Sequence, residues 1–146
     1  MSVLRNKRNI SKAEYVKCAN EICVETLAFL TKLSTKYSRL LSAHVAKLAL
    51  EVIEHTEKAN SIMPSDEQKK HIRRAHLLEA RASLMALDIE LARCYEILSR
   101  NPSAAMDMSK AEGAQHKLDA MAQSIGEKID LENDMIKKIM KSDAKR

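Results

Sequence analysis

The sequence predicts an all-α protein, an antiparallel up-down-up-down four-helix bundle that forms a single domain. Its 146 residues include two Gly and two Pro, so the residues that most often interrupt a helix are almost absent. Hydrophobic residues make up 45% of the chain and recur at spacings of three and four, which is the period of an amphipathic helix. The same composition excludes a β-sandwich, which needs frequent turn residues, and a Gly-rich phosphate loop, which two isolated glycines cannot form.

The first two predicted helices span 11–34 and 39–62 and are joined by a short polar link. Ser11 followed three residues later by Glu14 is a capping box, a pattern typical of a helix start. The second helix ends before Pro64, because a proline disfavours the helical conformation of the residue that precedes it. A link this short predicts that the two helices are antiparallel neighbours.

The third and fourth predicted helices span 65–99 and 110–141. Each starts at a further capping box, Ser65 to Gln68 in one case and Ser109 to Glu112 in the other, and 99–109 is the longest loop. The third helix carries one apolar stripe from Leu77 to Leu98 and a second stripe beside it. The second stripe comprises Leu78, Ala82, Met85, Ile89 and Ala92. Because one neighbour cannot bury two stripes, this helix should contact at least two others.

The excess positive charge lies at the ends of the chain. Residues 1–12 hold four basic side chains and no acidic one, and the net charge of the whole chain is +5. We therefore expect a basic N-terminal tail over 1–10, a helical body over 11–141 and a basic C-terminal tail over 142–146. Basic ends favour a polyanion partner, because Lys and Arg that neutralise phosphates release counterions. Tails that only keep the protein soluble explain these charges equally well.

A second basic cluster opens the third predicted helix. It comprises Lys69, Lys70, Arg73, Arg74 and Arg81, around His71 and His76. Spacings of four and seven put most of these residues on one side of the helix, and Arg binds phosphate oxygens with two donors at once. Aromatic residues are only 3% of the chain, so a nucleic acid would be held by its backbone and shape rather than by base stacking. The alternative is a solvated face paired with Asp66, Glu67 and Glu79.

No catalytic or metal-binding pattern is present in the sequence. The histidines lack HxxxH and ExxH spacing, and the three cysteines lack CxxC spacing, so we expect buried, reduced thiols and neither metal nor cofactor. His55 lies within the apolar repeat of the second predicted helix, which indicates a core or interface position. Glu132 interrupts the apolar repeat of the fourth, so we expect its carboxylate to have an inter-helix partner or to make a subunit contact. A hydrolase using these two residues is the enzymatic alternative. The absence of a signal peptide and of a long apolar run predicts a cytoplasmic protein that does not enter a membrane.

Several short sequences occur together along the whole chain. They are Ser2-Val3, Lys7-Arg8, Ser11 to Tyr15, Ala59 to Ile62 with Pro64, Arg73-Arg74, His76 to Arg81, and Lys141 to Asp143. In this combination the chain resembles the accessory variability determinants, which are four-helix-bundle proteins of diversity-generating retroelements. The resemblance implies a non-enzymatic, ring-like homopentamer that binds the reverse transcriptase and its template RNA and supports mutagenic cDNA synthesis.

The resemblance and the charge pattern together define the candidate residues for binding RNA or polymerase. These are Lys7, Arg8, Lys69, Lys70, Arg73, Arg74, Arg81, Lys137, Lys138 and Lys141. The bundle is also similar to the proteins encoded in intervening sequences of bacterial ribosomal RNA genes. This second similarity implies an alternative function, a structural or adaptor oligomer that binds only proteins, through the second apolar stripe of the third helix.

Overall fold

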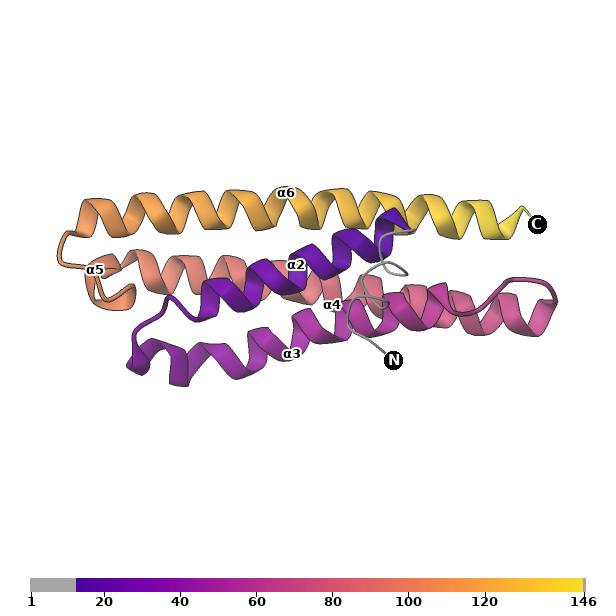
Figure 1. Ribbon diagram of the computed structural model, residues 1–146, viewed down its shortest axis with the longest axis horizontal. Helices are drawn as coiled ribbons and strands as arrows, with labels where there is room; N and C mark the ends of the chain where they lie inside the picture. The colour runs from indigo at the N-terminus through magenta and orange to yellow at the C-terminus, as the bar shows by residue number, and fades with distance from the viewer. Residues whose placement is uncertain (1–12, 146) are drawn as a thin grey trace, which may run out of the picture.

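The computed structural model describes residues 13–145, which form five α-helices and no strand (Figure 1). The helices are α2 (Glu14–Leu30), α3 (Thr35–Asn60), α4 (Glu67–Ser99), the one-turn α5 (Pro102–Ala105) and α6 (Ala111–Ala144). The all-α prediction is therefore confirmed for this part of the chain. The predicted tail over 1–10 lies outside the described residues.

The four long helices lie side by side, and each packs against two of the others. α3 contacts α2 and α4, α6 contacts the same two helices, and α5 covers the adjoining ends of α6 and α4 (Figure 1). With 33 and 34 residues, α4 and α6 are each about 50 Å long, whereas α2 has 17 residues. At one end of the molecule the start of α4 and the end of α6 therefore extend beyond α2 (Figure 1).

The core is a continuous column of aliphatic side chains contributed by all four long helices. Its largest fully buried members include Ile22, Val45, Val52, Leu77, Leu84, Leu87, Leu98, Leu118, Ile129 and Ile136. Complete burial of one such side chain contributes about 1.5 to 3 kcal/mol. The stripe of α4 from Leu77 to Leu98 points into this column, as its spacing predicts, and α4 does contact two long neighbours.

The helix starts differ from those that the capping boxes predict. At α4 the cap is Asp66 rather than Ser65: the Asp66 carboxylate accepts a hydrogen bond from the backbone N–H of Lys69 at 2.8 Å. A carboxylate caps as well as a hydroxyl does and also interacts favourably with the positive end of the helix dipole. α6 begins after Lys110, with no side-chain cap from Ser109. Ser11 lies outside the described residues.

The links between helices lie at other positions than expected: α2 already ends at Leu30, so residues 31–34 form the first link. α3 begins at Thr35, because Ser34 already adopts the extended N-cap conformation, so most of the predicted polar link is helical. Within the loop predicted over 99–109, Pro102 occupies the first position of α5, where its missing N–H costs nothing. α6 continues to Ala144, so the C-terminal tail predicted over 142–146 is mostly the last turn of a helix.

The helices of residues 13–145 are amphipathic rather than apolar throughout. None of them has a stretch that is both long enough and apolar enough to cross a lipid bilayer.

Candidate nucleic-acid interface

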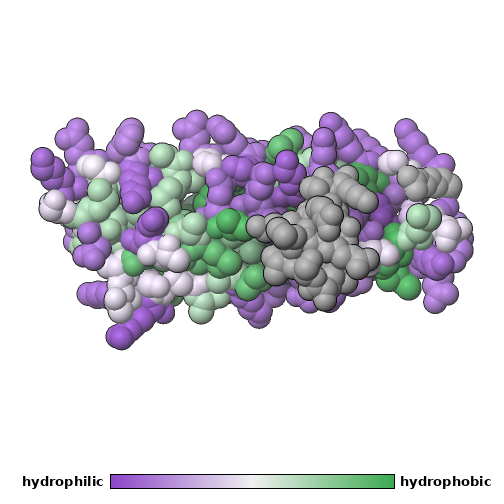
Figure 2. Space-filling view, viewed as in Figure 1, coloured by the Kyte–Doolittle hydropathy of each residue, from purple (hydrophilic) through white to green (hydrophobic). Residues whose placement is uncertain are grey.

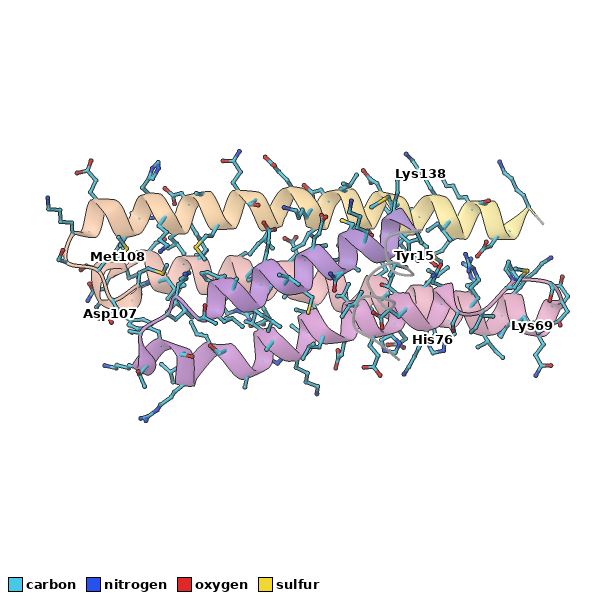
Figure 3. The ribbon with its side chains drawn as sticks, in the orientation of Figure 1. Tyr15, Lys69, His76, Asp107, Met108 and Lys138 are labelled. Carbon is cyan, nitrogen blue, oxygen red and sulfur yellow. The ribbon has the colours of Figure 1, made fainter. Side chains whose placement is uncertain are left out.

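The start of α4 and the end of α6 both carry basic side chains, and the two helices lie side by side where they extend beyond α2 (Figure 1). The two helices are joined there by an ion pair of 2.6 Å between Arg73 Nε and Asp143 Oδ2. This contact places the start of α4 beside the end of α6, and Figure 3 shows Lys69 and Lys138 on this half of the molecule. We call this surface the basic end and define it by Lys69, Lys70, Arg74, Lys137, Lys138 and Lys141. Sequence spacing did not predict this proximity, because about 70 residues separate its two halves.

A cavity of about 230 Å³ lies at the basic end, between α4 and α6. Its basic lining residues are Lys70, His71 and Arg74, and the N-terminus of α4 adds the partial positive charge of a helix dipole. The lining also contains two carboxylates, but each has a cation nearby: Glu67 pairs with Lys70 at 3.3 Å, and Asp143 pairs with Arg73. With Glu67 paired to Lys70 and Asp143 paired to Arg73, Arg74 is the charged lining residue without an ion pair among residues 13–145.

Two of the predicted binding residues, Arg73 and Arg81, have partners inside the chain. Besides its ion pair, Arg73 donates from Nη1 to the carbonyl oxygens of Ala59 and Ile62, each at 3.1 Å, and its side chain is only 13% exposed. Arg81 donates from Nε to Asn133 Oδ1 at 2.9 Å, which joins α4 to α6. Arg73 thus uses two of its three guanidinium nitrogens within the chain and Arg81 uses one, and both arginines join helices in this structure.

The other predicted residues are better placed to meet a ligand. Arg74, Lys137, Lys138 and Lys141 are exposed, and no hydrogen bond or ion pair engages their side chains among residues 13–145. Lys69 lies 3.9 Å from Asp66. An exposed pair of this kind contributes about 1 kcal/mol or less, so a polyanion can compete for it, whereas the Lys70 side chain is half-buried beside Glu67. Lys7 and Arg8 lie outside the described residues.

A polar cluster that the sequence analysis did not identify fixes the start of α2 on the bundle. The Tyr15 hydroxyl donates to Asn60 Oδ1 at 3.1 Å, joining α2 to the end of α3. Burial raises the pKa of Tyr15, and the nearby Arg73 guanidinium partly offsets this effect. Figure 3 shows Tyr15 at the point where the long helices meet. Tyr15 has helical spacing with other apolar residues, so its sequence signal was that of a core residue.

Glu132 is fully buried on α6, facing the start of α2. Neither of its carboxyl oxygens has a hydrogen-bond partner in the structure, so the expected inter-helix partner is not found among the described residues. Burial alone raises the pKa of Glu132 to about 8. The carboxyl group is therefore mainly protonated at pH 7. In this neutral form it does not place an unpaired charge in the core.

The remaining nucleophilic and metal-binding side chains form structural contacts. His55 of α3 and His76 of α4 face each other, with their Nδ1 atoms 3.3 Å apart and their ring centroids 5.6 Å apart. This confirms an interface position for His55. Within residues 13–145, no three side chains of His, Cys, Asp or Glu are grouped to hold a metal ion. The three cysteines are unpaired and buried, as predicted, and burial raises the pKa of Cys18 to about 12.

The second apolar stripe of α4 is left uncovered. Leu78 is 45% exposed and Ile89 is 59% exposed, whereas Met85 between them is partly buried. Residues 13–145 therefore leave Leu78 and Ile89 of this stripe largely open to solvent.

Comparisons with known protein families, with curated proteins and with solved structures give no match for this chain. Functional conclusions therefore depend on its own residues and on the surfaces that they form.

Proposed function

We propose that this protein is a non-enzymatic accessory subunit of a diversity-generating retroelement. In this role it binds the reverse transcriptase and its template RNA in the cytoplasm and supports mutagenic cDNA synthesis. Its scaffold is an antiparallel up-down-up-down four-helix bundle, a topology favoured by the short links and by the pairwise packing of the long helices. One observation carries the proposal: the fold brings basic residues that are distant in the sequence to the basic end.

RNA is the polyanion that this surface fits best. Arg74 offers a fork of donors for phosphate oxygens, and Lys137, Lys138 and Lys141 supply further charges on the adjacent helix. Tyr95, one of the few aromatic residues, is engaged in a hydrogen bond with Asp119. Contacts to the RNA backbone are therefore expected to dominate over base stacking.

The reverse transcriptase enters the proposal through the resemblance to accessory variability determinants, and so does the homopentamer. The exposed stripe of α4 supports self-association, because subunits that assemble bury apolar side chains that a monomer leaves in water. The basic end and the exposed stripe comprise different residues, and they adjoin on α4, where Leu78 lies one helical turn after Arg74.

The direct test measures RNA binding at several salt concentrations. Replacing Arg74, Lys137 and Lys141 together by Ala should weaken binding of a structured RNA. It should also flatten the slope of log affinity against log salt by about two to three, since each phosphate contact contributes about 0.7 to 0.9. A matched control removes three exposed cations from the opposite end, by Lys36→Ala, Arg39→Ala and Lys117→Ala. Equal losses in both triple variants would show that only net charge matters and would contradict a specific basic end.

The polymerase partner requires a separate experiment. Tagged protein purified from its native cell should bring down a reverse transcriptase, identified by mass spectrometry, and treatment with ribonuclease would show whether RNA bridges the two proteins. Recovery of unrelated proteins alone would reject the retroelement assignment.

The alternative function is a structural or adaptor oligomer that binds only proteins, and the exposed stripe of α4 is the observation that favours it. This alternative expects self-association without any RNA binding at physiological salt. The salt titration described above therefore separates the two functions.

A further inference from the structure

A groove of about 450 Å³ runs between α4 and α6. Its apolar lining includes Leu91 of α4 and Leu118 and Ile125 of α6. The groove is open because the residues that line it include small ones on both helices, namely Ala92 of α4 and Ala122 and Gly126 of α6. At Gly126 an added Cβ would have no neighbouring atom within 4 Å, so there is free space above this residue. A groove with an apolar floor and free volume is suited to receive apolar side chains.

The charges around this groove all have one sign. Asp88 and Glu96 are its only charged lining residues, and neither has an ion-pair partner among residues 13–145. The adjoining outer surface of α6 continues the pattern with Glu127, Asp130 and Asp134, which are exposed and also lack an ion pair in this part of the chain.

Leu131 lies between these acids and is 54% exposed. In Figure 2 the surface along α6 is mostly hydrophilic, with a small hydrophobic patch near the middle of the helix. From residue 127 to residue 134 the outer side of α6 and the groove thus form one acidic surface with apolar positions in it, which ends one turn before Lys137 and Lys138 and is complementary to a basic and apolar segment.

The chain itself contains such a segment. Residues 1–12 include Val3, Leu4 and Ile10 together with four basic residues and no acidic one. This segment joins α2, whose first turns lie against α6: the Cys18 thiol donates to the carbonyl oxygen of Lys128 at 3.5 Å.

The length of the segment is sufficient to reach the groove. Twelve extended residues span at most about 40 Å. The path halfway around a helix 10 to 12 Å in diameter is about 17 Å. A segment that leaves α2 beside α6 can therefore pass around α6 with about half of its residues to spare.

We propose that residues 1–12 cross the outer side of α6 and bind in the groove between α4 and α6 of the same chain. The basic side chains of the segment pair with Glu127, Asp130 and Asp134, and Val3 and Leu4 fill the space above Gly126. In this bound state Lys7 and Arg8 face carboxylates rather than phosphates. RNA then has to displace the segment before it can use these two cations.

Photo-crosslinking of the full-length chain tests this proposal. A benzophenone amino acid is placed at Leu4, and the same amino acid at the exposed Val24 of α2 serves as the control. Isotopically heavy and light proteins are mixed before irradiation, so that mass spectrometry separates crosslinks within a chain from crosslinks between chains. The expected result is a crosslink from position 4 to residues 88–96 or 118–129 of the same chain, and none from position 24 to the groove.

Filling the groove provides the second variant. Gly126→Leu should abolish the crosslink from position 4, whereas Gly113→Leu, the same change near the start of α6, should leave it intact. Both variants should keep the helical circular dichroism spectrum, since neither new Cβ is closer than 3.6 Å to another atom. A crosslink to another surface, a crosslink only between chains, or no crosslink at all would overturn the proposal. RNA is absent from the experiment, so its outcome is independent of the proposed RNA binding.

Discussion

Adjacent arginines in α4 have different roles because the helix turns by about 100° between them. Arg73 faces the bundle and binds Asp143 and two carbonyl oxygens, whereas Arg74 faces solvent beside the cavity of the basic end. Charge alone does not distinguish these two residues. Their neighbours decide that one is structural and that the other is available to a ligand.

This difference predicts that Arg73→Ala lowers the stability of the protein, whereas Arg74→Ala lowers its affinity for RNA. Arg73→Ala leaves Asp143 without its ion-pair partner and removes one hydrogen bond from each of the Ala59 and Ile62 carbonyls, so the free energy of unfolding should fall by about 2 to 4 kcal/mol in urea denaturation. Arg74→Ala should change that free energy by less than about 0.5 kcal/mol and should instead lower RNA affinity. If Arg73→Ala weakens RNA binding as much as Arg74→Ala while the protein remains folded, the structural role assigned to Arg73 is incorrect.

Glu132 links stability to pH through its buried carboxyl group. Its pKa in the folded protein is about 8, above the ordinary value of 4.5 that applies when the chain is unfolded. Between these two values the folded state retains a proton that the unfolded state has lost. The contribution of this group to stability is therefore complete below about pH 4.5, falls as the pH rises to about 8, and then stays constant.

We predict that Glu132→Met removes this pH dependence and raises the melting temperature at pH 8. Within the window, the wild-type protein should lose at most about 1.4 kcal/mol of stability per pH unit from this group. Glu112→Gln, which changes an exposed acid on the same helix, is the control and should retain the wild-type pH profile. Parallel pH profiles for Glu132→Met and the wild type would show that the carboxyl group is not neutral in the folded state.

At the scale of single helices, the start of α4 shows how two neighbouring polar residues compete for one role. Ser65 and Asp66 both have side chains that are able to cap a helix, and the structure selects Asp66. Asp66→Ala should therefore reduce the free energy of unfolding by about 1 kcal/mol. Ser65→Ala should have an effect within about 0.5 kcal/mol, as expected for an exposed position. Chemical denaturation of both variants tests the assignment, which the reverse order of effects would contradict.

The two stripes of α4 have different environments although they lie side by side on one helix. The stripe that includes Leu84 is buried except at Leu91, which lines the groove, and the stripe that includes Leu78 and Ile89 stays largely exposed. Periodicity identified both stripes, but it did not show which of them the chain covers. That depends on where α2, α3 and α6 pack.

At the scale of the whole molecule, the exposed stripe predicts the behaviour of the assembly. Leu78→Glu combined with Ile89→Glu should dissociate an oligomer and leave folded monomers, because both side chains already contact solvent. Leu84→Glu should instead unfold the protein, since it would bury a charge in the core. Light scattering coupled to size-exclusion chromatography, together with circular dichroism, distinguishes these results. An oligomer that survives the double substitution would place its interface elsewhere.

The sequence was sufficient for the all-α class, for the four long helices and for most core positions, because helical period and the scarcity of Gly and Pro are local properties. Basic candidates such as Lys137 and Arg74 were also recognisable from charge alone. The sequence did not show that they lie on adjoining helices at one end of the molecule, that Arg73 pairs with Asp143, or that Glu132 lacks a hydrogen-bond partner among residues 13–145. Those features depend on contacts between residues about 70 positions apart or on burial by several helices at once. They are therefore properties of tertiary packing, which no local pattern encodes.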